Sequence, residues 1–547
     1  MPNTRCLQIL ASLVAFAVIP IAGEERVDLT AIHKIREEAL QNSKVMDHVF
    51  QLTDVYGPRL TNSPGFFAAA DWVVRQLKEW GIEGHEEKWG PFGRGWTFTH
   101  FSANLIEPQY APLIGFPLAW SPGTNGVVTG EAMVANIAAE ADFDRYRGKL
   151  KDKIVFMGVG RELTMITTSL GQRYTDDELS KLSAAADGGG RGGAPGTTAL
   201  GDGRGGRGGR GGPDGQPGGQ NAQQQLRNKI NQFLKDEDVA VVVRLGGGQS
   251  SGGTVFGQDA GSRDVKDPVP PPTVALTPEH YNRVMRLLDN KIPVKLEFDI
   301  QAKFLDDRTD SVNVIGEIPG GRKRDEVVMI GAHLDSWQGG TGATDNAAGC
   351  AVMIEAMRIL KTLNLPMDRT VRMALWSGEE EGLLGSRAYV TEHFANREDM
   401  KLKPEHAKLA GYFNVDNGSG KIRGVYLQGN DAMRPVFEEW FKPFQDLGAG
   451  TISIRNTGGT DHQSFDAVGL PGFQFIQDGL EYNSRTHHSN MDVYDRVQRA
   501  DMAQMAAIVA SFVYEAANRV EMLPRKPLPK PQPPQNGRGG GAPTSAN

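Results

Sequence analysis

Residues Val327–Ser336 read VVMIGAHLDS, and a little further on Asp345–Gly349 read DNAAG. The first segment begins as an apolar run typical of a buried strand, and it ends in an imidazole and a carboxylate. A helical pattern follows over Ala347–Leu363, so a strand leads through a polar loop into a helix. This order predicts an α/β sheet, in which ligands bind beyond the carboxyl ends of the strands.

The alternation of strand and helix continues from about residue 306 to residue 522. Apolar runs predict strands at Val327–Gly331, Thr370–Trp376, Ala410–Val415, Gly424–Leu427 and Gly472–Ile476. A second long helix is expected at Arg499–Arg519, and the upstream region 24–110 has amphipathic helix patterns such as Ala69–Trp80. We therefore expect a sheet with helices on both faces.

Polar clusters rich in carboxylates and imidazoles follow these strands. They are Ala332–Ser336, Gly378–Gly382, Asp416–Asn417, Thr460–His462 and Thr486–Asp492. In an open α/β sheet these clusters converge, and their charges in a buried crevice would repel one another without a cation. Nitrogen and carboxylate ligands without a thiolate suit zinc and, less specifically, manganese or cobalt.

Five motifs in this order resemble those of a known enzyme family. They are H-x-D at His333–Asp335, D-N-A-A-G at Asp345–Gly349, G-E-E-E-G-L-L-G-S at Gly378–Ser386, N-V-D at Asn414–Asp416 and H-H-S-N-M-D at His487–Asp492. The family is that of the zinc exopeptidases that include bacterial di-zinc aminopeptidases, glutamate carboxypeptidase and carboxypeptidase Q. The resemblance covers about 24–110 and 306–522, and it implies a three-layer domain with a mixed sheet and two Zn²⁺ per chain.

The resemblance also implies roles for individual residues. His333 and Asp416 are expected to bind one zinc, Glu380 and His488 the other, and Asp345 both. Asp335 is expected to orient the imidazole of His333, and Glu379 matches the general base that activates a bridging water. In the family the peptide bond after the bridging aspartate is often cis, here Asp345–Asn346.

Other residues near these motifs are candidates for substrate contacts. His487 is a candidate for lining the substrate pocket, and His462 is either a pocket group or a structural one. Tyr482 and Arg485 are candidates for binding a substrate terminus, with a surface role as the equal alternative for Arg485. Glu381 is expected to be solvated or to start a helix, and Cys350 is expected to be an inert core thiol.

The central segment 115–305 has a different character, with strand-like runs at Lys153–Val159, Val239–Leu245 and Val294–Ile300. It is similar to the β-rich protease-associated domain that is inserted in some members of the family. The peptidase domain would then consist of 24–114 and 306–522. Residues 188–220 are mostly glycine and predict a disordered loop, and 523–547 predict a disordered tail.

Composition and the N-terminal segment indicate the cellular location of the protein and the partners it is expected to have. Residues 1–23 carry one arginine before an apolar run and are interpreted as a signal peptide, so we expect an exported protein that is free of the membrane after cleavage. The net charge of −7 disfavours a nucleic-acid partner, and two cysteines cannot form a disulfide scaffold. A homodimer is possible, as in related proteins.

Three functions remain open at this stage. The first is an exopeptidase, either an aminopeptidase, a carboxypeptidase or a dipeptidase, that acts on peptides or dipeptides. The second is a relative without activity that only binds, and the third is an acyltransferase similar to the single-zinc glutaminyl cyclases. Zinc content separates them, because they hold two, none and one ion per chain. Every ligand position of the two-metal set is filled here, which favours the exopeptidase.

Overall fold

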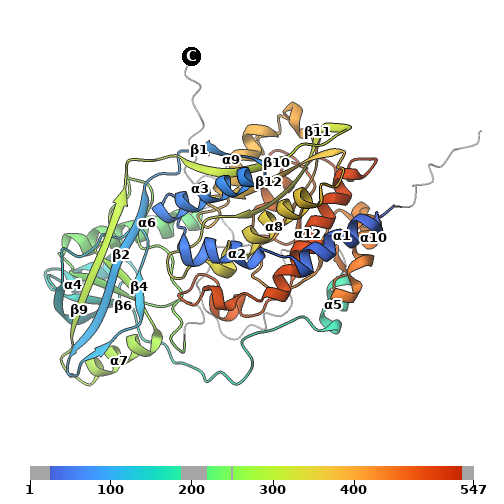
Figure 1. Cartoon of the computed structure of the whole chain (residues 1–547). Helices are drawn as coiled ribbons and strands as arrows, with labels where there is room; N and C mark the ends of the chain where they lie inside the picture. Colours follow the sequence, from blue (N-terminus) through green and yellow to red (C-terminus); the bar gives the residue numbers. More distant parts are fainter. Residues whose placement is uncertain (1–24, 186–217, 248–250, 533–547) are drawn as a thin grey trace, which may run out of the picture.

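The computed structural model describes residues 25–185, 218–247 and 251–532, and within them the chain forms two eight-stranded mixed sheets (Figure 1). The expected signal peptide at 1–23 lies outside the described residues. So does most of the expected loop at 188–220, whose last three residues begin helix α6 (Gly218–Asp236).

The first sheet has parallel strands at its centre. Its order is β1 (Glu83–Trp89), β10 (Ser311–Ile318), β12 (Arg369–Trp376), β11 (Lys323–His333), β13 (Leu409–Asn414), β16 (Gly472–Gln477), β14 (Ile422–Tyr426) and β15 (Thr451–Ser453). Strands β12, β11, β13 and β16 run parallel, and their register places His333 beside Trp376 and Gly331 beside Asn414. The polar segments that follow these strands therefore emerge at one edge of the sheet.

Helices cover both faces of this sheet, as the sequence predicts. One face carries α1 (Leu29–Gln41), α2 (Val45–Phe50), α3 (Pro64–Glu79), α8 (Ala348–Leu363), α10 (Arg434–Phe441) and α12 (Arg499–Asn518) (Figure 1). The other face carries α9 (Leu384–His393) and α11 (His462–Asp466). Helix α12 is buried almost throughout, because its many alanines let it lie close to α8 and to the strands.

The second sheet has its own core. Its order is β3 (Ala111–Pro112), β2 (Gly95–Glu107), β9 (Lys295–Leu305), β5 (Val128–Ala135), β6 (Ile154–Met157), β7 (Val241–Leu245), β8 (Thr273–Leu276) and β4 (Gly115–Pro117). Helix α7 (Pro278–Asp289) covers one face, and α4 (Phe143–Tyr146) and α6 cover the other. Helix α5 (Asp176–Ser183) leaves this sheet and contacts β15, where the Ser183 hydroxyl donates to the Ile452 carbonyl.

The expected domain boundary at residue 115 does not coincide with a boundary between the sheets. Strand β2 starts at Gly95 and pairs with β9 from Gly95–Leu305 to Glu107–Lys295. The second sheet therefore begins before residue 115, because this long antiparallel pairing joins segments that are far apart in the sequence.

The expectation of a disordered tail from residue 523 is wrong for residues 523–532. The side chain of Leu523 is 2% exposed and belongs to the main hydrophobic core. The guanidinium of Arg525 donates to the carbonyls of His406 at 2.9 Å and Leu409 at 2.6 Å. These two side chains fix a proline-rich segment that has no regular structure of its own, while residues 533–547 lie outside the described part.

None of the helices within residues 25–185, 218–247 and 251–532 combines the length and the apolar character needed to cross a lipid bilayer.

The anchoring of the tail can be tested at Leu523. The Leu523→Ala variant should lower the free energy of unfolding by about 2–3 kcal/mol, because it removes a buried side chain and leaves a cavity. Denaturant unfolding followed by tryptophan fluorescence measures this change. Leu528→Ala is the matched control, since Leu528 is 54% exposed and its loss should cost under about 1 kcal/mol. Equal effects of both variants would mean that the tail is not anchored at Leu523.

Candidate metal centre

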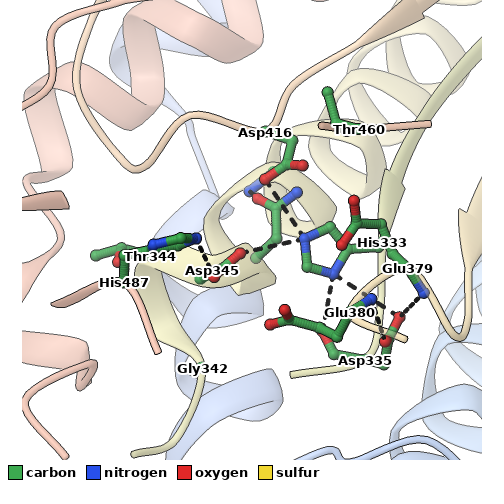
Figure 2. Close-up of polar contacts among 12 residues, drawn as sticks. His333, Asp335, Gly342, Thr344, Asp345, Glu379, Glu380, Asp416, Thr460 and His487 are labelled. Carbon is green, nitrogen blue, oxygen red and sulfur yellow. Dashed lines mark hydrogen bonds and ion pairs between the residues drawn. The ribbon is translucent and has the colours of Figure 1, made fainter. Parts of the chain in front are cut away.

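The predicted ligand residues meet at the carboxyl edge of the first sheet, and Figure 2 labels four of them, His333, Asp345, Glu380 and Asp416. His333 is the last residue of β11, Glu379 and Glu380 follow β12, and Asp416 follows β13. Asp345 lies just before α8. His488 comes from the loop after β16. The structure thus brings together side chains that are far apart in the sequence.

The carboxylate of Asp345 lies between two imidazoles. Its Oδ1 is 3.2 Å from Nε2 of His333, and its Oδ2 is 3.2 Å from Nε2 of His488. Nε2 of His333 is also 3.4 Å from Oδ1 of Asp416, and Nε2 of His488 is 2.9 Å from Oε2 of Glu380. The two oxygens of Asp345 therefore face two separate sets of nitrogen and oxygen atoms.

These atoms suit divalent metal ions. Four buried atoms in this cluster make no hydrogen bond to the described residues, namely His333 Nε2, Asp345 Oδ2, Glu380 Oε1 and Asp416 Oδ1. Asp345, His487 and His488 form one group whose potential ligand atoms lie within 4.8 Å of one another, and His333, Glu379 and Asp416 form another. Imidazole and carboxylate donors without a thiolate fit zinc.

The cluster carries an excess of negative charge. Burial raises the pKa of Glu379 well above its usual range, and the charges of Asp416 and Asp461 raise it further. Burial also raises the pKa of Glu380 to about 7, with a further contribution from Asp345. A buried group of carboxylates relieves this repulsion either by taking up protons or by binding a cation.

Asp335 contacts the imidazole of His333 through its backbone carbonyl rather than through its carboxylate. The ring nitrogen Nδ1 of His333 donates to the backbone carbonyl of Asp335 at 3.0 Å, whereas the nearest carboxylate oxygen is 3.8 Å away. The carboxylate instead accepts from the backbone N–H groups of Glu379 at 3.3 Å and Glu380 at 3.2 Å. Asp335 therefore fixes both the imidazole and the loop that presents the two glutamates.

Asp492, the last residue of the H-H-S-N-M-D motif, holds the segment that carries Asp345. Its carboxylate accepts from the backbone N–H of Thr344 at 2.6 Å, from the Thr344 hydroxyl at 2.8 Å and from the Asp345 N–H at 3.2 Å. The peptide bond between Asp345 and Asn346 is cis, as expected.

Arg59 is a fully buried cation beneath the site. Its guanidinium donates to the carbonyl groups of four residues, Leu52, Leu334, Thr341 and Gly342. These bonds tie together the segments on either side of the ligands His333 and Asp345. Nothing in the local sequence around Arg59 indicates this position, because its partners come from distant segments.

Two of the four candidate substrate residues lie beside the ligands. The ring centroids of His487 and His488 are 3.6 Å apart, and Nε2 of His487 is 3.7 Å from Oδ2 of Asp345. The ring of Tyr482 is 4.7 Å from the ring of His487.

The other two candidates have partners of their own. Arg485 lies 3.5 Å from the carboxylate of Glu481. His462 is fully buried, with Nε2 at 2.8 Å from the amide nitrogen of Gln428 and at 3.2 Å from the Thr457 carbonyl. A substrate contact of His462 does not fit this position, whereas the structural alternative does.

Glu381 and Cys350 also have defined surroundings. Glu381 is half-buried rather than solvated, and it accepts a hydrogen bond from the Thr61 hydroxyl at 3.1 Å. Cys350 is buried in α8, and burial raises the pKa of its thiol to about 12, so the expected inert core thiol is confirmed.

Comparison with known proteins identifies relatives over part of the chain. Carboxypeptidase Q from Pongo abelii is 31% identical over 273 residues, which are 50% of this chain and 55% of that protein. Aminopeptidase YwaD from Bacillus subtilis (strain 168) is 30% identical over 216 residues, which are 38% of this chain and 45% of that protein. The chain thus spans about half the length of the curated relatives it matches.

Solved structures share the fold over most of the chain. A peptidase M28 precursor from Shewanella amazonensis SB2B matches 92% of this chain and 98% of its own, with a TM-score of 0.61 and 23% identity. BSAP, a zinc aminopeptidase from Bacillus subtilis, matches 87% of this chain and 94% of its own, with a TM-score of 0.52 and 18% identity. Residues 313–513 match the model of peptidase family M28.

Proposed function

We propose that the protein is a zinc-dependent exopeptidase that hydrolyses peptide bonds near a chain terminus with two Zn²⁺ per chain. The observation that carries this proposal is the position of Asp345, whose two oxygens each lie 3.2 Å from a different imidazole nitrogen. A carboxylate with this arrangement can bind two ions at once. Carboxypeptidase Q and the zinc aminopeptidase among the relatives support the same class of reaction.

The ligands divide into two sets around Asp345. His333 and Asp416 would hold one ion, and Glu380 and His488 would hold the other. When bound, zinc ions would lower the pKa of a bound water and would polarise the carbonyl of the substrate.

Glu379 would act as the general base. Its carboxylate would accept the proton of the attacking water and then deliver it to the nitrogen of the leaving amine. The neighbouring Glu380 faces His488, so the two adjacent glutamates have separate tasks. The carboxylate of Asp335 supports both, because it holds the backbone N–H groups of the two residues.

The surroundings of the metal ligands would shape the substrate pocket. His487 and Tyr482 lie on the side of His488 and are placed to contact a bound peptide. We propose that the second sheet is the protease-associated-like domain expected from the sequence and that it narrows the access to the metal ligands. Its residues Val255 and Gly257 hydrogen-bond with the loop that carries His488.

We also propose that the protein is exported, on the basis of residues 1–23. Homodimerisation stays a prediction. The two alternative functions, a binding protein without metal and a single-zinc acyltransferase, differ from this proposal in zinc content. The full set of five ligand residues favours the two-zinc enzyme.

The role of Glu379 can be tested by the Glu379→Gln variant. It should retain both zinc ions but lose about 10³-fold or more in kcat, because the amide cannot accept the proton of the attacking water. Glu381→Gln is the matched control from the same run of glutamates and should stay within about tenfold of the unmodified enzyme. A Glu379→Gln variant with near-normal kcat would refute the assignment of the base.

The bridging role of Asp345 can be tested by counting metal ions. The Asp345→Asn variant should bind less than one zinc ion per chain, because both sets of ligands lose a shared oxygen. Asp416→Asn should retain about one ion, since Asp416 contacts only the His333 side. Elemental analysis after dialysis measures both. Retention of two ions by Asp345→Asn would contradict the bridge.

The terminus at which the enzyme acts can be found with a small set of substrates. We would offer one free peptide, its N-acetylated form, its C-amidated form and a dipeptide, and follow cleavage by mass spectrometry. Blockage by acetylation alone means an aminopeptidase, blockage by amidation alone means a carboxypeptidase, and turnover of the dipeptide alone means a dipeptidase. A protein with zinc that cleaves none of the four would refute the proposed function.

A further inference from the structure

Residues 253–259, here called the strap, run from the second sheet across the loop that carries His488. The backbone of Val255 donates to Oδ1 of Asn490 at 2.7 Å, and the N–H of Asn490 donates back to the Val255 carbonyl at 3.2 Å. The N–H of Gly257 donates to the carbonyl of His488 at 3.2 Å. The strap thus forms a short strand-like contact with this loop, in which Phe256 pairs with Ser489.

One side chain of the strap reaches the imidazole itself. The amide nitrogen Nε2 of Gln258 lies 3.0 Å from Nδ1 of His488, on the side of the ring opposite to the carboxylates. Nε2 of the same ring faces Glu380 at 2.9 Å and Asp345 at 3.2 Å. Gln258 therefore contacts one ring nitrogen of His488 while the other ring nitrogen faces the metal ligands.

Gln258 is held firmly in this place. Its backbone carbonyl accepts from the amide of Gln338 at 2.8 Å and from the N–H of Ala119 at 3.0 Å. Gln338 is itself buried, and its amide also donates to the carbonyl of Pro117 at 3.2 Å. These bonds fix the backbone from which the side chain extends, so that orienting the side chain costs only its own rotamer entropy.

His488 needs such support more than His333 does. His488 has a φ of 61°, in the left-handed region that a residue with a side chain rarely adopts. The ring of His333 is oriented by a carbonyl on its own chain segment, that of Asp335. The ring of His488 is instead oriented by Gln258, which is 230 positions away in the sequence.

The chemistry of a metal-binding imidazole determines what Gln258 would do. A histidine that binds metal through Nε2 carries its proton on Nδ1, and this proton requires an acceptor. A glutamine can supply its carbonyl oxygen after half a turn about the terminal bond, because the two ends of a carboxamide have nearly the same shape. It does so without adding another negative charge to the site.

We propose that Gln258 is a positioning residue, whose side-chain oxygen accepts the Nδ1 proton of His488 and so aims Nε2 at the metal. The second sheet thereby completes one half of the metal centre. This inference rests on the proposed function only in taking His488 as a metal ligand, and it does not require any particular substrate.

The test measures the affinity of the full purified chain for each zinc ion by competition with a chromogenic chelator. Gln258→Leu should weaken the binding of one of the two zinc ions by about 10–100-fold and leave the other unchanged, because only His488 loses its acceptor. Gln258→Glu should restore binding to within a few fold, since a carboxylate accepts the same proton. Gln232→Leu is the matched control, because Gln232 is exposed on α6 and contacts Asp236.

Several results would overturn the proposal. One is a Gln258→Leu protein that binds both ions as tightly as the unmodified protein, and another is one that loses both ions equally. A Gln258→Glu protein as weak as Gln258→Leu would also overturn it, because this would assign the effect to the shape of the side chain. The titration needs no peptide, so a failure of the proposed activity in the substrate assay is separable from a failure of this inference.

Discussion

Carboxylates that are buried side by side repel one another unless a cation lies between them, and this constraint shapes the whole centre. The carboxylates of Asp345, Glu379, Glu380 and Asp416 approach the imidazoles of two histidines at the edge of the first sheet. The charge of Asp461 also acts on Glu379. Neutral backbone groups hold the other charged side chains around the centre in place. Backbone N–H groups bind Asp335 and Asp492, and backbone carbonyls surround the guanidinium of Arg59.

This arrangement depends on the register of the parallel strands. Strands β11, β12 and β13 are buried on both faces, so a shift by one residue would move apolar side chains away from each core and would displace the residues that follow. The pairings of His333 with Trp376 and of Gly331 with Asn414 place the ends of the three strands side by side. The sheet thus acts as a rigid frame that sets the distances between side chains from three separate segments.

Much of the first sheet could be predicted, and so could the meeting of its polar segments at one edge, because each apolar run lies within a few residues of the polar groups that follow it. The local pattern did not indicate contacts across long sequence separations. The sequence of β2 does not indicate its pairing with the distant strand β9. The proline-rich sequence around Leu523 likewise does not indicate that this side chain packs in the main core. The structural position of His462 could not be predicted either, because its partner Gln428 comes from a different loop.

The second sheet does more than cover the metal ligands, because its connecting segments also hold one of the loops that carry them. The loop that carries His488 is held on one side by the strap and on the other by the segment before α5, where Gln172 and Leu480 exchange two backbone hydrogen bonds. The hydroxyl of Ser484 adds a bond to the Leu170 carbonyl. Both of these segments connect strands of the second sheet, so the position of His488 relative to His333 depends on how they pack against the loop. The distance between the His333 side and the His488 side of the centre therefore depends on the packing of the two sheets against each other and on the register within the first sheet.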